Sequence, residues 1–276
     1  MLSSSRLSGG KFTTFDIIGH LLFAESFDCL TSTEYHFWVS FFFDTVKIVT
    51  WIRALSRIDP RVVSGLLRLL PKRALEKGLM HLRASSEKLA RRRQRQHQIE
   101  YTDFVSHWIA AEEKALIDPE YLEANVPLLI AAGSETTSTV LSGLMYFLGK
   151  DARVYAKLVR EIRTVFATKE EINMSRLKEL EYLPAVIDET LRLYHPVSTS
   201  LPRVVPPQGI TLEGRYVPEG TRVGVSFYAA SRSRSNFCRS EEFIPERFLG
   251  DDEWKSDRKD ALQPFSYGPR NCIGKK

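Results

Sequence analysis

The chain has 276 residues, enough for one large domain or two ordinary ones. A composition of 43% hydrophobic and 26% charged residues excludes a disordered tail. The formal net charge of +5 suggests an acidic partner or a membrane surface, although charge alone does not separate these from nucleic acid. Three widely spaced cysteines without a Cys-x-x-Cys pair argue against a disulfide scaffold and a zinc cluster, and they fit a reducing compartment.

The N-terminal part of the chain predicts helices. Residues 1–14 are rich in Ser and Gly and are expected to be disordered. Residues 14–27 predict a helix with Thr13 or Thr14 as its cap, and residues 34–56 predict a second helix that ends before a proline. The aromatic stretch 37–52 is too short and too charged to span a bilayer, so we expect core packing, with a membrane surface as the alternative.

Residues 66–71 form a short apolar piece, and a strongly basic helix is predicted at residues 74–98. The helix carries four arginines near its end: Arg91, Arg92, Arg93 and Arg95. We expect these arginines to form a solvated helical face, and nucleic-acid binding is the alternative interpretation.

Residues 120–149 predict one long helix that is apolar on most sides, as expected for a helix through the middle of a domain. Because Pro127 lies within it, we expect a kink or a later start. Its centre reads Ala132-Gly133-Ser134-Glu135-Thr136-Thr137.

A glycine in mid-helix costs about 1 kcal/mol relative to alanine, so Gly133 needs a structural or functional reason. Ala132 and Gly133 would let a flat ligand lie against the backbone, or they would serve close helix packing. Glu135 and Thr136 could relay a proton or open the helical ladder. The alternative for Glu135 is a solvated surface carboxylate.

The second half of the chain predicts helices at residues 151–167 and 177–193 and short strands at 210–212 and 222–227. Glu189 and Arg192 stand three residues apart on one helical face. An exposed pair of this kind contributes only about 0 to 1 kcal/mol, so the spacing alone is weak evidence.

Near its end the chain reads Phe265-Ser266-Tyr267-Gly268-Pro269-Arg270-Asn271-Cys272-Ile273-Gly274. Glycines and a proline around one cysteine suit a backbone that turns tightly and approaches something flat and bulky. Cys272 is the one candidate soft ligand, and Arg270 could pair with an anionic group on the same bound molecule. A buried structural thiol is the alternative for the cysteine alone.

The pattern Phe-x-x-Gly-x-Arg-x-Cys-x-Gly closely resembles the haem-binding signature of the cytochrome P-450 family. Three further motifs follow the family's order: Ala-Gly-x-Glu-Thr-Thr, with Glu135 where many members have Asp, Glu-x-x-Arg, and Pro-x-Arg-Phe ending at Phe248. The resemblance runs from about Phe15 to the end of the chain. It is strongest to fungal members that decorate secondary metabolites.

The resemblance implies a mainly α fold with small β-sheets, a cytochrome P-450 fold that is incomplete. The partial domain would cover residues 15–276, with the central helix at 120–149 and the haem loop at 265–274. The N-terminal membrane anchor, the first strands and the helix after the cysteine are expected to be absent. The chain is therefore expected to be truncated at both ends.

The resemblance also implies roles for individual residues. Cys272 would be the thiolate ligand and metal-binding residue of haem b, and Glu135 and Thr136 would be catalytic through proton delivery. Glu189, Arg192 and Arg247 would form a buried charge network behind the haem loop. His195, where many relatives have proline, is expected to be a turn residue. The remaining cofactor-binding residues would be Arg270, Arg203, Phe265, Gly268, Gly274, Ala132 and Gly133.

The implied function is a monooxygenase that inserts one oxygen atom from O2 into a lipophilic substrate, in fungal secondary metabolite biosynthesis. NADPH would supply electrons through a flavoprotein reductase that docks on a basic face. The family works at the cytosolic face of the endoplasmic reticulum membrane, whereas this anchorless chain is expected to be cytoplasmic or peripheral.

Two alternatives remain from the sequence. One is a truncated, inactive fragment that does not bind haem. The other is a helical interaction protein whose arginine cluster at residues 91–95 binds an acidic partner or nucleic acid, although the ordered motifs argue against a nucleic-acid partner.

Overall fold

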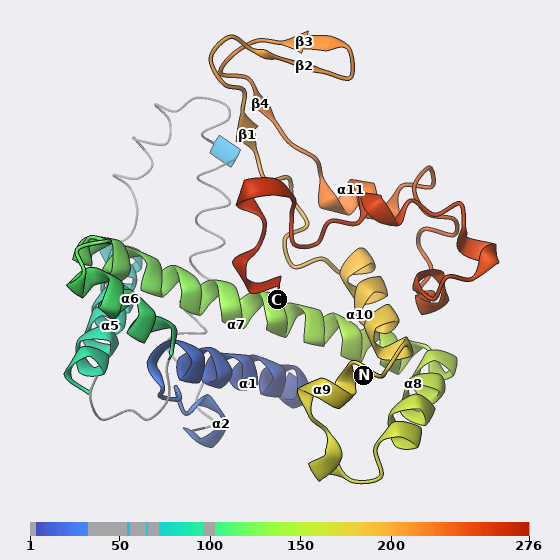
Figure 1. Ribbon diagram of the computed structural model, residues 1–276, viewed down its shortest axis with the longest axis horizontal. Coiled ribbons are helices and arrows are strands. Elements are labelled where there is room, and N and C mark those ends of the chain that lie inside the picture. The colour runs from blue at the N-terminus through green and yellow to red at the C-terminus, as the bar shows by residue number, and fades with distance from the viewer. Residues whose placement is uncertain (1–3, 33–53, 56–64, 66–71, 96–102, 276) are drawn as a thin grey trace. The chain divides into compact units, whose positions relative to one another are not determined.

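A computed structural model describes residues 4–32, 54–55, 65, 72–95 and 103–275. Within these ranges the protein is mainly helical and carries two small antiparallel sheets, as predicted (Figure 1). The helix expected at 34–56, the apolar piece at 66–71 and the surface or core role of 37–52 lie outside the described residues. Contacts divide the chain into two compact units, one up to Ser138 and one from Thr139 onward.

The first unit packs four helices against the N-terminal part of a long one. These are α1 (Ser4–Phe23), α2 (Cys29–Ser32), α5 (Lys72–Gln94), α6 (Phe104–Glu113) and α7 (Pro119–Lys150). Apolar side chains from α1, α5, α6 and α7 share one core, which includes Phe15, Leu22, Leu89, Ile109 and Ile130.

Helix α1 runs beside α7 (Figure 1) and begins at Ser4, ten residues before the predicted start. Residues 4–14 are therefore helical, contrary to the expected disorder, while the proposed domain limits themselves stay a prediction. Helix α7 begins at Pro119 beside Asp118, whose carboxylate accepts a hydrogen bond from the Glu120 amide at 2.9 Å. The helix continues through Pro127, so the later start considered from the sequence is wrong.

Three of the four clustered arginines, two on α5 and one directly after it, form ion pairs within this unit. Arg92 is 1% exposed and its Nε lies 2.5 Å from a carboxylate oxygen of Asp103, the residue that caps α6. Arg93 lies 2.7 Å from Glu112, and Arg95 pairs with Glu25. The expected solvated face is therefore wrong for Arg92, because this side chain is buried. A buried guanidinium requires a carboxylate partner, which Asp103 provides.

The second unit contains the C-terminal part of α7, then α8 (Ala152–Val165), α9 (Met174–Leu177) and α10 (Tyr182–Leu193). Asp151 caps α8 by accepting from the amides of Arg153 and Val154, both at 3.0 Å. Buried side chains of α8 and α10 form the core of this unit: Val154, Leu158, Tyr182 and Val186.

Helix α10 begins five residues later than predicted because a distant carboxylate caps it. The Glu161 carboxylate on α8 accepts from the backbone amides of Glu181, Tyr182 and Leu183 at 2.8, 2.6 and 3.0 Å. These amides have no partner within their own first turn, so the cap from α8 fixes where α10 starts. The preceding residues form the separate short helix α9.

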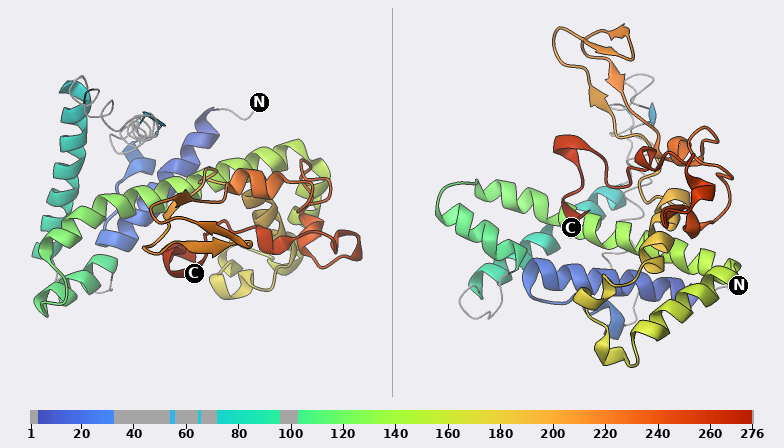
Figure 2. Two further views of the ribbon diagram at one scale, coloured as in Figure 1. Left: turned by 90° about the horizontal axis from the view of Figure 1, so that it is seen from above. Right: turned by 45° about the vertical axis from the view of Figure 1, so that its right-hand side comes forward.

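The two sheets follow α10 in the chain and precede α11. Strand β1 (Arg203–Val204) pairs with β4 (Arg222–Val223), and β2 (Ile210–Leu212) pairs with β3 (Arg215–Val217) in a hairpin beyond them (Figure 2). The strand predicted at 222–227 is shorter, because the Ser226 hydroxyl caps α11 (Phe227–Arg232) by accepting from the Ala229 amide.

The described residues also contain six short 3-10 segments. They are η2 (Lys169–Glu171), η3 (Pro245–Phe248), η4 (Asp252–Trp254), η5 (Lys259–Ala261), η6 (Gly268–Arg270) and η7 (Ile273–Lys275). Among the helices that the structure describes, none has the length and apolarity needed to cross a membrane.

Two glycines of α7 provide a matched test of packing in the second unit. A Cβ atom on Gly143 would lie 2.6 Å from Cδ1 and 3.1 Å from Cβ of Tyr194, whereas a Cβ on Gly149 would meet nothing within 4 Å. We expect Gly143→Ala to destabilise the protein by about 1–3 kcal/mol through overpacking. Gly149→Ala should stabilise it by about 0.5–1 kcal/mol through helix propensity. Thermal unfolding followed by circular dichroism measures both, and equal melting temperatures would contradict this packing.

Candidate functional site

The cysteine loop, residues 265–274, contains η6 and the start of η7 and is closed by two backbone hydrogen bonds. The Cys272 amide donates to the Phe265 carbonyl at 2.7 Å, and the Asn271 amide donates to the Gly268 carbonyl at 3.0 Å. Gly268 has φ 80°, a left-handed conformation that glycine adopts without strain. The turn therefore brings Cys272 back toward the start of its own loop.

The loop presents its thiol to solvent. Cys272 is exposed, so the alternative of a buried structural thiol is wrong for this residue. Cys29 is the buried thiol of the chain, and burial together with the nearby Asp16 carboxylate raises its pKa to about 12. The two cysteines thus differ in solvent exposure, and Cys29 has the environment of an inert structural thiol.

The donor set fits a haem that takes one protein thiolate. No cluster of three or more His, Cys, Asp or Glu side chains suited to a metal ion occurs in the part of the chain that the structure describes. A lone thiol suits a group that brings the other ligands of its own metal, as a porphyrin does. A Cβ on Gly274 would lie 3.9 Å from the Cys272 sulfur, so glycine keeps the space beside the sulfur open.

The two arginines predicted to bind the cofactor, for which the family resemblance implies contacts with haem propionates, are both exposed. Arg203 lies on β1, where its Nη1 is 3.3 Å from the Leu201 carbonyl and 3.2 Å from the Pro202 carbonyl. Arg270 lies within the cysteine loop itself, at the end of η6. Neither is held by a carboxylate among the interactions of the described residues, and their propionate contacts stay a prediction.

The small-residue motif of α7 lies at the end of the first unit. A Cβ on Gly133 would lie 2.6 Å from Cδ1 of Ile18 on α1, so close helix packing already requires glycine here. The Thr136 hydroxyl donates to the Ala132 carbonyl at 2.6 Å, and Thr136 and Glu135 are half-buried. The helix continues through these residues, so its ladder of backbone hydrogen bonds is not opened here. Contact of Ala132 and Gly133 with haem stays a prediction.

The Glu189, Arg192 and Arg247 network is confirmed. Glu189 and Arg192 on α10 form a two-pronged pair, with Nε to Oε2 at 2.6 Å and Nη2 to Oε1 at 2.8 Å. Oε1 also accepts from Arg247 Nε at 3.1 Å and from the Ile244 amide at 2.8 Å. All three charged side chains are fully buried. One carboxylate therefore joins α10 to η3.

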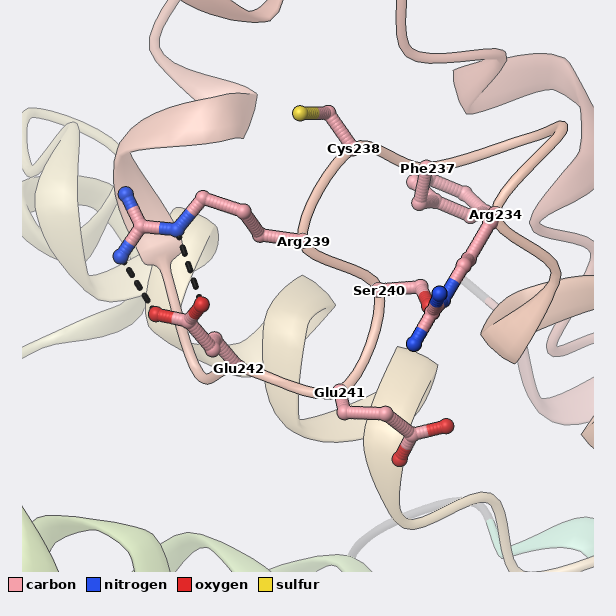
Figure 3. A pocket seen from close by; sticks show the side chains of 7 residues that line it. All are labelled: Arg234, Phe237, Cys238, Arg239, Ser240, Glu241 and Glu242. Atoms are coloured by element: carbon pink, nitrogen blue, oxygen red, sulfur yellow. Dashed lines mark hydrogen bonds and ion pairs between the residues drawn. The ribbon is translucent and has the colours of Figure 1, made fainter.

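Arg192 also holds the segment between α11 and η3. Its guanidinium donates to the carbonyls of Ser231, Ser240 and Glu242 at 2.8, 2.6 and 2.9 Å. Residues 237–242 curve around a pocket of about 390 Å³, in which Arg239 and Glu242 form an exposed ion pair (Figure 3). The backbone of this segment, rather than its side chains, is what Arg192 recognises.

The motifs missed a fourth charged member, Asp257. Its Oδ2 pairs with Arg247 Nη1 and its Oδ1 accepts from the Cys238 amide at 2.7 Å. A sequence signal for it exists, because the predicted network had two buried arginines and one glutamate and therefore an unbalanced positive charge. That argument calls for a second acid but does not say which one.

Around the network, His195 behaves as the expected turn residue. Its Nδ1 accepts from the Val197 amide at 2.9 Å, and its ring stacks on Phe227 with centroids 5.0 Å apart. Burial lowers the pKa of His195, which favours the neutral ring. No sulfur or carboxylate partner of this histidine appears among the hydrogen bonds of the described chain.

The protein is mainly helical, carries an exposed thiol on a glycine-bent loop and contains a buried Glu-Arg-Arg network. A single exposed thiolate is the kind of protein ligand that a haem can take. A family model described as Cytochrome P450 matches residues 11–276. The chain belongs to the cytochrome P450 family.

Curated relatives from fungi agree with the family model. Cytochrome P450 monooxygenase astJ of Aspergillus oryzae is 44% identical over 269 residues, which cover 96% of this chain and 53% of the relative. Cytochrome P450 monooxygenase aclL of the same species is 42% identical over 268 residues, which cover 96% of this chain and 54% of the relative. Cytochrome P450 monooxygenase astA of Talaromyces wortmannii is 41% identical over 267 residues, which cover 96% of this chain and 53% of the relative. The chain spans about half the length of the curated relatives it matches.

Glu246, the carboxylate of η3, contacts both α8 and α10. Its Oε1 lies 2.6 Å from Arg153, 3.1 Å from Lys157 and 3.0 Å from the Tyr182 hydroxyl. Burial acts to raise the pKa of Glu246, but hydrogen bonds from Arg153, Lys157 and Tyr182 outweigh it and lower the pKa to about 2.

A carboxylate with a lowered pKa stabilises the folded state above its unfolded pKa, here 4.5, and this stability is lost as the pH falls toward 2. We therefore expect Glu246→Gln to lower stability at neutral pH by about 1 kcal/mol, since solvent screens the exposed Arg153 and Lys157. The difference from the parent should vanish near pH 2. Urea unfolding across this range measures it, with Glu241→Gln as control for the loss of one charge. A difference independent of pH would refute the assignment.

Proposed function

We propose that this chain is the haem-binding part of a monooxygenase. Its Cys272 thiolate would be the protein ligand of haem b, and Arg270 and Arg203 would pair with the propionates. The observation that carries the proposal is the exposed thiol on a loop whose preceding segment is joined to a buried charge network. Bound haem would supply activation of O2 and insertion of one oxygen atom into a C–H bond.

The surroundings of the cysteine support this role. Gly268 adopts the left-handed turn, and Gly274 leaves room next to the sulfur, so the loop can approach a flat macrocycle closely. Phe265 begins the loop and fixes it through its carbonyl, which accepts from the Cys272 amide. Ala132 and Gly133 would face the haem from α7, in addition to the packing that Gly133 already provides.

Glu135 and Thr136 would manage protons during the reaction. The Thr136 hydroxyl gives its hydrogen to the Ala132 carbonyl, which leaves its oxygen lone pairs to accept a hydrogen bond from water. The neighbouring Glu135 is half-buried and offers a carboxylate on the adjacent position of the helix. Such a pair can hold an ordered solvent molecule and pass a proton along it.

The substrate would be a lipophilic organic molecule of fungal secondary metabolism, since the relatives are fungal enzymes named as monooxygenases. Electrons would come from NADPH through a flavoprotein reductase, and the net charge of +5 suits an acidic docking face on that partner. The place of action would be the cytosolic face of the endoplasmic reticulum membrane.

Replacement of the ligand tests the proposal directly. We expect Cys272→Ala to lose haem, because no second thiolate lies in the loop, while Cys238→Ala, which removes the other exposed thiol, should retain it. Haem content and the carbon-monoxide difference spectrum of the reduced chain are the measurements. The parent should show a strongly red-shifted Soret band, which signals thiolate ligation.

Two results would count against the proposal. Normal haem loading of Cys272→Ala would contradict the assignment of Cys272 as the haem ligand. A parent chain that takes up no haem would favour the alternative of an inactive fragment over a haem-binding enzyme.

Thr136→Ala tests proton delivery. The hydroxyl bonds within its own helix, so folding should be unchanged. We expect substrate binding to survive while a larger share of NADPH oxidation ends as peroxide rather than product. Thr136→Ser, which keeps the hydroxyl, should restore coupling. Unchanged coupling in Thr136→Ala would show that this hydroxyl does not deliver protons.

A further inference from the structure

Asp257 contacts two separate parts of the second unit at once. Its Oδ2 pairs with Arg247 Nη1, and its Oδ1 accepts from the Cys238 amide at 2.7 Å. The side chains of Asp257 and Arg247 are both fully buried. A carboxylate in this position uses both oxygens and has a defined geometry.

The charges of the buried cluster balance only when Asp257 is included. Glu189 and Arg192 already form a two-pronged pair, and Arg247 shares one oxygen of that same glutamate at 3.1 Å. Without a second acid, one buried guanidinium charge would be uncompensated, which is strongly unfavourable in a low-dielectric interior. Asp257 supplies the missing negative charge.

Asp257 is also the last buried residue before the cysteine. From Arg258 to Lys275 every residue is exposed or half-exposed, and Cys272 lies within this stretch. The Arg258 amide donates to the Asn236 carbonyl at 2.7 Å, so the backbone is held at the same point. Beyond it the backbone hydrogen bonds of the segment are short-range turns, and His195 contacts the backbone of Pro264 just before the cysteine loop.

We propose that Asp257 is a positioning residue for Cys272. Its carboxylate neutralises Arg247 and fixes the start of the exposed segment that carries the thiol, so that the loop leaves the buried cluster at one defined place. The role in haem ligation rests on the proposed function of Cys272, whereas the anchoring of the segment does not.

The test compares Asp257→Asn with Asp260→Asn. Both remove one negative charge from the same segment, but Asp260 is 73% exposed and lies 3.5 Å from the exposed Arg258. In the haem-free chain we measure amide hydrogen exchange at Asn271 and Cys272. Asp257→Asn should lower protection about tenfold or more, because the buried pair is broken. Asp260→Asn should leave protection as in the parent.

With haem added, Asp257→Asn should shift part of the carbon-monoxide band away from its red-shifted position, which reports loss of the thiolate bond. Exchange at Asn271 and Cys272 equal to that of Asp260→Asn would overturn the proposal. If the parent chain takes up no haem, the proposed function fails. The anchoring role of Asp257 is still tested in that case, because the exchange measurement needs no haem.

Global unfolding is separated from loss of the anchor by exchange in α8, which Asp257 does not contact. If Asp257→Asn loses protection there too, Asp257→Glu keeps the charge and is measured instead. The proposal then requires restored protection in α8 with lowered protection at Cys272, and parental values at both places would overturn it.

A double variant tests the charge balance. Arg247→Gln combined with Asp257→Asn leaves the neutral pair of Glu189 and Arg192 intact. The loss of stability in the double variant should be clearly smaller than the sum of the two single losses, because neither buried charge is then left alone. Additive losses would show that Asp257 does not compensate Arg247.

Discussion

A single buried carboxylate, that of Glu189, is the interaction on which the C-terminal half of this protein depends. It accepts from two guanidinium groups and one backbone amide, and so joins α10, η3 and the residue that precedes η3. Buried charge is tolerated only when it is completely paired. The requirement for pairing therefore determines the path of the chain after α10 more strictly than apolar contact alone would.

The cluster does more than neutralise charge. Arg192 donates to one carbonyl of α11 and to two carbonyls of the segment after it. Arg247 lies over the Trp254 ring with its guanidinium carbon 4.8 Å from the ring centroid. These contacts give a segment with little regular secondary structure a fixed course. Such stretches are usually the mobile parts of a protein, because few of their polar groups bond within an element. Here the arginines provide those partners.

The sequence predicted the helices whose apolar stripes are long, such as α7, α8 and α10, because burial of one face produces a regular spacing. The predicted start of α10 was wrong, because the carboxylate that caps this helix belongs to Glu161 on another helix. The residues next to the start of α10 therefore carry no capping pattern that would mark it. The motifs predicted Glu189, Arg192 and Arg247 correctly, whereas Asp257 was missed because its contact with Arg247 is made in space and belongs to no motif. Gly133 was read as a ligand contact or a packing site, and its neighbour Ile18 lies too far away in sequence to decide between them.

Arg192 recognises the main chain of Ser231, Ser240 and Glu242, and every residue type has a backbone carbonyl. Ser231 and Ser240 are buried, whereas Glu242 is exposed, so the side chain at position 242 is free to vary while the guanidinium keeps the same backbone partner. Substitution of the exposed residues that line the pocket, such as Arg239, Glu241 and Glu242, can remodel this surface without altering the backbone contacts of Arg192. At this point of the fold the exposed side chains can therefore change in evolution while the buried contacts of Arg192 are preserved.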